Sequence, residues 1–404
     1  MTLSLLCVLA GLNAGPVAAE LCQAEKDQGF VSIFNGRDLT GWHYIGQHDK
    51  VFLARGGELR CNSLLNAPRG NYPSWLRSEK TYENFVLRFD YKIPYYCESG
   101  LLIHAPLHGR GSRTGIKIVL TEDTARGAHT QRTGTILGVA REKTLVATKH
   151  STWYAMEVRM DYPRLQVTLN NKVVQDIDCA KNEKLRYRMR QGHIGFTAMG
   201  SPCTFRNIRI KELPSKEKWI RLLDRIPGID SKDNWVPLKE GKDLGGWAIS
   251  GKGVRWEVRD GVLRATGNGY LIGGDEWQDF ELFTYVRATP HANGGIFYRW
   301  KGLDPKTWDR AYEIQIYNNP EGNNPTGSIY RYDRNDNLNI ADNAWFPLQV
   351  FVKGKTVLTR VNGDDGAFSD QRVEFVRPGR IVLQMHRHGS RIEFKDLRVK
   401  SLDR

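Results

Sequence analysis

The chain has 404 residues, of which 40% are hydrophobic and 10% aromatic, and its formal net charge at pH 7 is +14. A chain of this length and apolar content is too long for one ordinary core, so two globular domains are expected and long disordered spans are excluded. The Lys and Arg are dispersed, with no run of five and no nucleic-acid motif, which argues against a nucleic-acid partner.

The N-terminus resembles an export signal. An apolar run, Leu3 to Leu12, is followed by small residues, with Val17 and Ala19 placed for cleavage before Glu20. We therefore expect residues 1–19 to be a signal peptide and the mature chain to be extracytoplasmic, either periplasmic or secreted. The alternative is a buried N-terminal segment. No other apolar run approaches the roughly 18 residues of a membrane-spanning helix, so no transmembrane segment is predicted.

Cysteine usage leaves the disulfide pattern open. Removal of the signal peptide would remove Cys7 and leave an odd number of cysteines, so at least one thiol stays free or links to another chain. No CxxC or Cys/His ligand spacing is present, which argues against structural zinc. One disulfide, for example Cys179–Cys203, is compatible with export. The five remaining cysteines, whose pairing the sequence does not assign, are Cys22, Cys61, Cys97, Cys179 and Cys203.

Six stretches of the chain recur in the same order. VSIFNGRDLTGW, ending at Trp42, returns as WVPLKEGKDLGGW, ending at Trp247, and ESGLLIH, from Glu98, returns as NGGIFYR, from Asn293. The other pairs include YENFVLRFDYKI with WQDFELFTYVRA, and TGTILGV with TGSIYRY. This repeat predicts two related domains, residues 28–213 and 233–403. The joining segment, PSKEKWIRLLDRIPGIDSKD, is predicted to be a connector with a short helix and a turn.

Each repeat reads as an all-β domain. Short runs of alternating apolar and polar residues are separated by turn signals such as Asn35-Gly36, Asp260-Gly261 and Asn362-Gly363. About ten short antiparallel strands in each repeat imply a sandwich of the jelly-roll kind. Along the first repeat, the basic and Gly-rich segment 107–115 is interpreted as a hairpin loop, with a partner surface as the alternative.

Residues 293–319 hold the most informative pair of strands, predicted over 295–300 and 311–317. Period-two alternation places Glu313, Gln315 and Tyr317 on one strand face, with Ile314 and Ile316 on the other. A carboxylate, a carboxamide and a phenol in a row form a ligand-binding surface if the face is concave. On a flat face they are an ordinary solvated surface.

Four of these segments together resemble the 3-keto-disaccharide hydrolase-like family. They are FNGRDLTGW, the strand GGIFYR, the strand YEIQ and the closing LQMHRHG…FKDLRV, and the likeness covers both repeats. The resemblance implies a concanavalin A-like or laminin-G-like sandwich with carbohydrate chemistry on its concave face. In active members the substrate is a sugar oxidised at C3. The ketone acidifies the C2 proton, a general base removes it, the glycosidic oxygen leaves C1, and water then adds.

The repeat predicts which domain carries the site. The second repeat holds a polar set that the first repeat replaces, so the second is the candidate active domain and the first has a degenerate site. Ala311-Tyr312 stands where the family usually has a Gly. The second-repeat residues Arg299, Glu313, Gln315, Gln384 and His386 align with His104, Lys117, Val119, Thr197 and Met199.

Roles for these residues follow from their chemistry. Glu313 or His386 is the predicted base, with Arg299 and Gln384 as oxyanion partners. The alternatives are an exposed Glu313 paired with Arg299 or Arg310, and histidines that are ordinary polar side chains. The predicted substrate-binding residues are Gln315, Gln384, Tyr298, Tyr317, Trp300, Trp308 and His388; packing in the core is the alternative for the aromatic ones.

No cofactor is required by this chemistry, and no metal ligands are predicted. A divalent ion such as calcium is an open alternative, because Asn318, Asn319, Glu321, Asn323 and Asn324 could supply oxygen ligands, although no calcium loop is recognisable. The expected partner is an oligosaccharide or glycoside, and the positive charge favours an anionic one. The function predicted is an exported hydrolase or lyase acting on 3-keto-glycosides; the alternative is a non-catalytic, lectin-like tandem sandwich. Convergence of Glu313, Arg299 and His386 in one pocket would favour the enzyme, and side chains that point to different surfaces would favour the lectin-like alternative.

Overall fold

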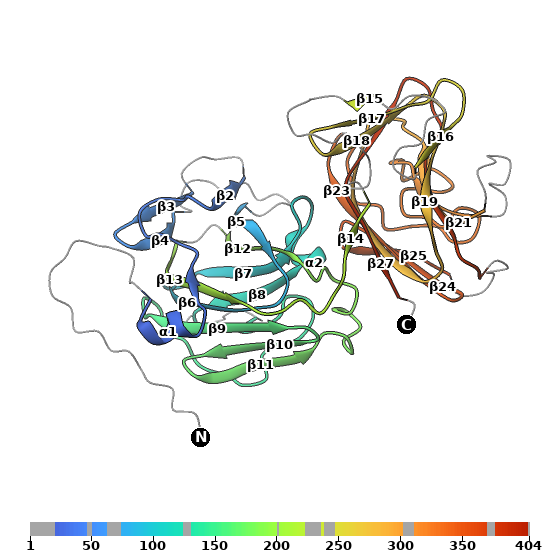
Figure 1. Ribbon diagram of the computed structural model, residues 1–404. Helices are drawn as coiled ribbons and strands as arrows, with labels where there is room; N and C mark the ends of the chain where they lie inside the picture. The colour runs from blue at the N-terminus through green and yellow to red at the C-terminus, as the bar shows by residue number, and fades with distance from the viewer. Residues whose placement is uncertain are drawn as a thin grey trace. The chain divides into compact units, whose positions relative to one another are not determined.

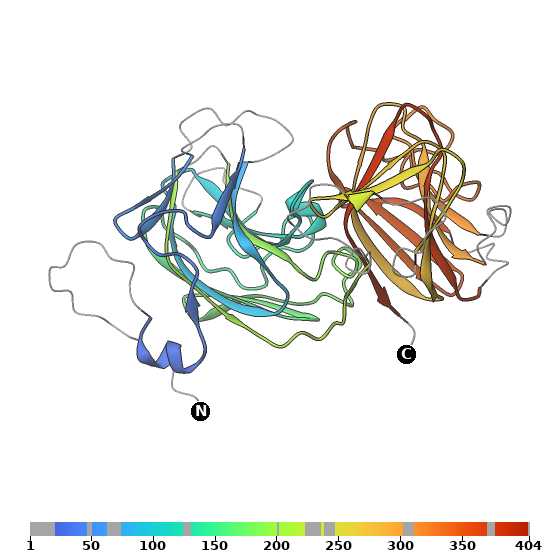
Figure 2. The same ribbon diagram turned by 45° about the horizontal axis from the view of Figure 1, so that its top comes forward.

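The computed structural model describes residues 21–46, 51–62, 74–123, 131–199, 202–222, 236–237 (backbone only), 247–301, 311–369 and 376–402. The chain divides into two compact units, Met1–Lys216 and Glu217–Arg404, and nearly all of their regular structure is β-strand (Figures 1 and 2). Across the described residues, no helix is long and apolar enough to cross a membrane. The expected signal peptide lies outside the described residues.

The first unit is a sandwich of two antiparallel sheets. The larger has eight strands in the order β11-β10-β9-β6-β13-β4-β3, with β1 also on β13, and the smaller has the order β2-β5-β12-β7-β8. The elements are α1 (Gln23–Asp27), β1 (Val31–Ser32), β2 (Trp42–Ile45), β3 (Phe52–Arg55), β4 (Glu58–Cys61), β5 (Ser74–Tyr82), β6 (Phe85–Lys92), β7 (Glu98–Ala105), α2 (Gly111–Thr114), β8 (Ile116–Thr121), β9 (Tyr154–Asp161), β10 (Arg164–Leu169), β11 (Lys172–Asp178), β12 (Gly192–Ala198) and β13 (Cys203–Glu212).

The second unit repeats this architecture. Its larger sheet has the order β15-β17-β18-β27-β20-β23-β24-β25, with β14 also on β27, and its smaller sheet has the order β16-β19-β26-β21-β22. The strands are β14 (Ile220–Arg221), β15 (Val236–Pro237), β16 (Ala248–Ser250), β17 (Arg255–Arg259), β18 (Val262–Thr266), β19 (Gly269–Trp277), β20 (Phe280–Ala288), β21 (Gly294–Trp300), β22 (Tyr312–Ile316), β23 (Phe346–Lys353), β24 (Thr356–Val361), β25 (Asp364–Ser369), β26 (Gly379–Met385) and β27 (Arg391–Ser401).

The core of each unit lies between its two sheets, as alternation along the strands predicts. In the smaller sheet of the second unit, Ile314 and Ile316 of β22 and Leu383 of β26 belong to the buried cluster that also includes Phe280 and Val350 of the larger sheet. Every second residue of these strands therefore faces away from the larger sheet. The predicted fold, two tandem jelly-roll-type sandwiches, is confirmed.

Two local predictions differ from the structure. In the connector, expected to contain a helix, the described part ends in the two-residue strand β14, which pairs with Arg398–Val399 of β27; residues 223–235 lie outside the described part. The β27 edge offers open hydrogen-bonding groups, so the connector adds a strand there. Within 107–115, Gly111–Thr114 form the single turn α2.

In each unit, two basic residues on the larger sheet pack over a tryptophan ring. In the first unit, Lys92 Nζ and the Arg206 guanidinium lie 4.5 and 4.0 Å from the centre of the Trp153 ring. In the second, Arg287 and Lys395 lie 4.7 and 4.4 Å from the Trp345 ring at the matching strand positions. These cations contribute packing through cation–π contacts. The net charge alone therefore does not identify an anionic ligand.

The described cysteines are all free thiols, so the suggested Cys179–Cys203 disulfide is absent from the structure. The register of β13 and β4 instead places Cys203 directly opposite Cys61, and both are buried. The hydrogen bond from Cys203 and burial raise the pKa of the Cys61 thiol, and burial raises that of Cys179 to about 12.

We expect slow reaction of the three buried thiols, Cys61, Cys179 and Cys203, with a disulfide reagent such as Ellman's reagent in the native protein. The thiolate is the reacting species, and burial suppresses it. Half-buried Cys22 and Cys97 should react first, and all five should react in denaturant. Peptide mapping after a short alkylation identifies the modified positions. Early labelling of Cys179 would contradict this expectation.

Candidate functional site

A row of polar residues crosses the outer face of the smaller sheet in the second unit. Tyr270 on β19 pairs in register with Gln384 on β26, which pairs with Gly295 on β21, and Gly295 pairs with Gln315 on β22. The neighbouring residues of these strands point into the core, so the row faces outward. The predicted shared face of Glu313 and Gln315, opposite Ile314, is confirmed.

Glu313 reaches into this row from the next position of β22. Its register partner is Phe297, but its carboxyl extends over Gly295: a Cβ built on that glycine would lie 2.4 Å from Glu313 Oε1. A Cβ at 295 would therefore push the Glu313 side chain out of its present position. The glycine thus creates the space in which the carboxyl lies beside Gln384 and Gln315.

The environment of Glu313 favours its neutral form. The residue is 8% exposed, and burial raises the pKa of its carboxyl from 4.5 to about 8, against a smaller lowering by the charge of Arg331. Within the described part of the chain, no hydrogen bond or ion pair reaches this carboxyl. A carboxyl that titrates close to neutral pH can accept and return a proton during a reaction.

The two carboxamides beside Glu313 are each held by one neighbour. Gln315 Nε2 donates to Asn293 Oδ1 at 2.9 Å, and Gln384 Nε2 donates to the Tyr270 hydroxyl at 3.4 Å. Burial raises the pKa of Tyr270, as does the charge of Glu313, while the hydrogen bond from Gln384 lowers it. The Tyr270 hydroxyl therefore remains a proton donor at neutral pH, close enough to Glu313 to feel its charge.

Buried aromatic side chains pack beside this row of polar residues. Trp300 is fully buried, and its ring centre lies 5.2 Å from that of Tyr270 and 5.2 Å from that of Phe297. Trp300 thus packs against Tyr270 and Phe297 on the outer face and is too buried to stack on a sugar, contrary to the prediction. Tyr298 is likewise not available to a substrate, because it lies in the core between the sheets and stacks on Tyr312 at 5.4 Å.

A bulge at Arg299 separates these two aromatic residues onto opposite faces. The backbone of Arg299 has φ 58°, and the pairing of β21 with β26 shifts register between Phe297 and Trp300. Uninterrupted alternation would put Tyr298 and Trp300 on one face. One extra residue in a strand moves each following side chain to the opposite face of the sheet. The prediction that Tyr298 and Trp300 share a substrate-binding role was therefore wrong.

The structure places Arg299 away from Glu313. Its guanidinium is fully buried and donates to the carbonyls of Gln278, at 3.3 Å, and Gly354, at 2.8 Å, and it lies 3.5 Å from Asp279. These partners belong to the turns that precede β20 and β24. The predicted convergence of Arg299 with Glu313 is therefore not found, and Arg299 ties turns together.

The first unit shows that this role is structural. His104, at the position of Arg299, also has a left-handed backbone, φ 50°, and its Nε2 lies 2.6 Å from the carbonyl of Glu83. Glu83 occupies the turn position that Gln278 occupies in the second unit. Two unrelated side chains thus secure the same turn, whereas the nearby site residues differ.

The remaining predicted residues lie at the margin of the face. His386 and His388 are exposed and follow β26, and the backbone N–H of His386 donates to the carbonyl of Asn293, the residue that holds Gln315. The Tyr317 hydroxyl accepts from Asn319 Nδ2 at 3.1 Å, within its own loop. Trp308, with Arg310, lies outside the described residues.

Two residues of the site were missed by the sequence interpretation, Tyr270 and Arg331. Arg331 has φ 68°, and the repeat aligns it with Gly138, which has φ 69°. Glycine adopts this conformation without strain, whereas arginine does so at a cost of about 1 kcal/mol. An arginine in a position suited to glycine is a signal of function that comparing the repeats could have revealed.

No metal site emerges from the described residues, since nowhere in them do three or more His, Cys, Asp or Glu side chains cluster. Among the candidate calcium ligands, Asn318 Oδ1 accepts from Thr326 Oγ1 and Asn319 Oδ1 from the N–H of Glu321. These amide oxygens therefore serve their own loop.

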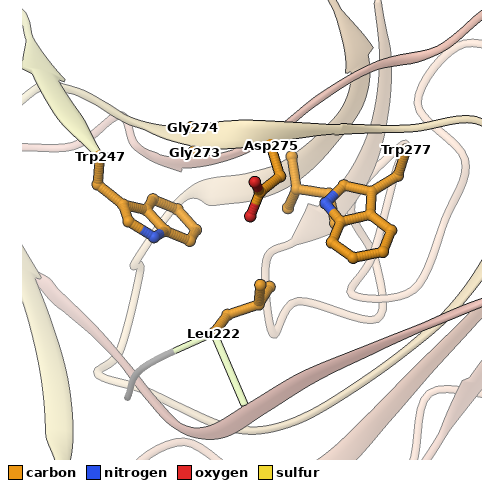
Figure 3. Close-up of a pocket in the computed structure, with 7 residues that line it drawn as sticks. Leu222, Trp247, Gly273, Gly274, Asp275 and Trp277 are labelled. Atoms are coloured by element: carbon orange, nitrogen blue, oxygen red, sulfur yellow. The ribbon is translucent and has the colours of Figure 1, made fainter. Parts of the chain in front are cut away.

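A small hollow at another part of the second unit is not connected with this face. Figure 3 shows the Asp275 carboxyl between the indoles of Trp247 and Trp277, with Leu222 opposite. Trp247 and Leu222 belong to the core cluster, so the hollow lies at the rim of the space between the sheets. It holds about one water molecule and is too small for a sugar ring.

Together, the fold and the face define a tandem β-sandwich protein with a buried, acidic and carboxamide-lined site on one sheet. The chain belongs to the family described as the 3-keto-alpha-glucoside-1,2-lyase-like domain, which matches twice, over residues 29–211 and 234–400. The resemblance noted from the sequence is thereby confirmed, and with it a relation to carbohydrate-active proteins.

Among the solved structures similar to this chain are two that each match slightly less than half of it. A candidate glycosyl hydrolase from Parabacteroides distasonis ATCC 8503 is 21% identical with a TM-score of 0.42, and the match covers 49% of this chain and 100% of that one. Carbohydrate-binding module CBM66 from Bacillus subtilis is 13% identical with a TM-score of 0.30, covering 43% and 96% respectively. Among curated proteins, nothing matches the chain.

Proposed function

We propose that the second sandwich cleaves 3-keto-glucosides between the sugar C1 and the glycosidic oxygen, with Glu313 as the base. The observation that supports this most is the buried Glu313 carboxyl, which titrates near pH 8 and has no partner in the described part of the chain. A surface carboxylate serving only solubility would be exposed and ionised. The family description, a lyase acting on 3-keto-α-glucosides, supports the same chemistry.

In this reaction the ionised Glu313 takes the C2 proton, which is acidic because the C3 ketone turns the resulting carbanion into an enolate. The electron pair of the enolate then forms the C1–C2 double bond as the C1–O bond breaks. The alcohol leaves with a proton from the Tyr270 hydroxyl or from the newly protonated Glu313. Gln384 and Gln315 can donate N–H bonds to the C3 oxygen as negative charge develops on it. Addition of water to C1 would complete hydrolysis.

The direct test is incubation of the full chain with p-nitrophenyl 3-keto-α-glucoside. Release of nitrophenol, with transient absorbance from the conjugated enone, is the expected result, and the parent glucoside with a C3 hydroxyl should not react. Cleavage of both compounds at equal rates would contradict the C2 mechanism, because only the ketone acidifies C2. Absence of cleavage with saturable binding would favour the lectin-like alternative.

That alternative has two observations in its favour, of which the first is that Arg299 and His386 do not converge with Glu313. At neutral pH the protonated Glu313 offers an uncharged hydrogen-bonding surface with Gln315 and Gln384, which would also suit binding of sugar hydroxyl groups without reaction.

We also propose that the protein is exported, on the basis of the apolar leader. N-terminal sequencing of the native protein should then give a start at Glu20.

The rate of cleavage should rise with pH. The base must be ionised, and the pKa of Glu313 is raised to about 8, so kcat/KM should be low at pH 6 and increase through about pH 8 before levelling off. Arg331→Gly provides a matched variant: removing the cation that lowers this pKa should move the midpoint to higher pH, while glycine suits φ 68° and preserves folding. A rate that falls between pH 6 and 8 would refute Glu313 as the base.

A further inference from the structure

The first unit keeps the geometry of the Glu313 site with a charge of opposite sign. Lys117 on β8 is 4% exposed, and a Cβ built on Gly100 would lie 2.2 Å from Lys117 Cε. Gly100 pairs with Val119 as Gly295 pairs with Gln315. In both units a long side chain from the edge strand lies across the glycine, and a Cβ there would displace that side chain.

The Lys117 ammonium is buried as an ion pair. Its Nζ lies 3.1 Å from Oε1 of Glu98, whose side chain is 25% exposed at the start of β7. Burying an ammonium is unfavourable even when it is paired, and an apolar side chain is commonly at least as stable. Neighbouring Val119 shows that this sheet accepts an apolar residue. Retention of the ion pair indicates a use other than stability.

Thr197 places a further polar group in this region, a hydroxyl without a hydrogen-bond partner among the described residues. It is 1% exposed and occupies the position that Gln384 holds in the second unit, one residue past the pair formed by Phe196 and Leu101. Its Oγ1 is buried and has no hydrogen-bond partner in the described residues. Such a hydroxyl loses its water without compensation unless a bound group satisfies it.

Aromatic residues lie on the same face and at its end. Trp75 pairs in register with Thr197 and is 7% exposed. Tyr95 and Tyr96, 54% and 63% exposed, immediately precede the strand that begins with Glu98. Exposed aromatic rings next to polar side chains are typical of surfaces that bind the apolar faces and hydroxyl groups of sugars.

We infer that the first sandwich binds an uncharged glycan at Lys117, Glu98 and Thr197 without reacting with it. The ammonium donates to sugar hydroxyls, while the carboxylate and the threonine hydroxyl accept from them. The ion pair is neutral overall, which favours an uncharged pyranose unit over a uronic acid. The first sandwich is then a non-catalytic glycan-binding domain, and its binding chemistry differs from that of the second sandwich. This inference does not depend on the second sandwich being catalytic.

The test uses the full chain carrying Glu313→Gln, compared with the same chain carrying Thr197→Val or Lys117→Met in addition. The probes are a printed array of neutral and uronic-acid oligosaccharides, followed by calorimetric titration with the neutral oligosaccharide retained most strongly. We expect Thr197→Val, which is nearly isosteric, to weaken binding at least about tenfold. Its thermal midpoint should be equal or higher, because an unpartnered hydroxyl is removed. Lys117→Met should abolish retention.

Three outcomes would overturn the proposal: no retention of neutral oligosaccharides, retention of uronic acids alone, or full affinity in Thr197→Val. Thr168→Val, the same substitution on the larger sheet of the first unit, is the matched control and should leave retention intact. Retention that is lost in Gln384→Thr but not in Thr197→Val would assign binding to the second unit. Binding that persists when Glu313→Gln has stopped turnover separates this proposal from the catalytic one.

Discussion

Glu313→Gln is expected to lower kcat by about 10²- to 10⁴-fold, the usual contribution of a positioned general base. Glutamine has nearly the same shape, so it keeps the side chain over Gly295 and tests the proton transfer alone. Steady-state kinetics with the 3-keto-glucoside above pH 8, where the wild-type base is ionised, measures the difference. An unchanged kcat would assign the base to another residue.

The same variant should be more stable than the wild type at neutral pH. Between about pH 4.5 and 8 the unfolded chain ionises Glu313, whereas the folded protein keeps it protonated, so folding binds a proton and stability falls as the pH rises through this window. Glutamine removes this cost, which is about 3 kcal/mol at pH 7. Chemical denaturation at pH 4 and pH 7 should show the gain only at the higher pH. A loss of activity with a gain of stability distinguishes a functional carboxyl from a structural one.

Arg299→Ala is expected to reduce the free energy of unfolding by about 3–5 kcal/mol, because it removes a fully buried cation and leaves its partners unpaired. The carbonyls of Gln278 and Gly354 lose their donor, and Asp279 loses its counter-charge. Denaturant unfolding of the second unit measures this effect. Folded protein that remains at low denaturant should keep nearly normal kcat, since Arg299 does not reach Glu313.

Arg299→His is the control that the chain itself provides. The matching His104 donates to the equivalent turn carbonyl, and burial lowers its pKa to about 4, so the ring is neutral in the folded protein. Histidine at 299 should therefore recover part of the stability lost in Arg299→Ala. A large fall in kcat with unchanged stability in either variant would restore a catalytic role to Arg299.

The sandwich architecture was predictable because alternation, turn signals and the internal repeat all depend on local sequence. The facing of Glu313 and Gln315 followed from the same alternation, since β22 has no bulge. The prediction of which face each side chain occupies was wrong for Tyr298 and Trp300. Arg299, with its left-handed backbone, inserts a bulge into β21, and the periodicity of the sequence does not reveal it. Trp300 therefore packs against Tyr270 on the outer face of the sheet.

The composition of the site was less accessible. Tyr270 lies more than 40 residues from Glu313 along the chain, and only the strand order β19-β26-β21-β22 brings them onto one face. Arg331 enters from a loop through a left-handed backbone conformation, which only the alignment with Gly138 of the first repeat could have suggested. The raised pKa of Glu313 depends on burial by neighbouring strands, which composition cannot give. The sequence thus indicated the strand that carries Glu313, the proposed base, but not the residues that lie beside it.

The glycines at 100 and 295 have a consequence for how such a protein can change. Each leaves an open volume above the centre of a sheet, filled by whatever side chain the edge strand supplies, so exchanging that side chain leaves the two-sheet core untouched. An acid and a base have both been accepted at this point within one polypeptide. Duplication of the domain therefore provides two equivalent positions, Lys117 and Glu313, that can vary independently. New ligand specificities can evolve at these positions by single substitutions without loss of the fold.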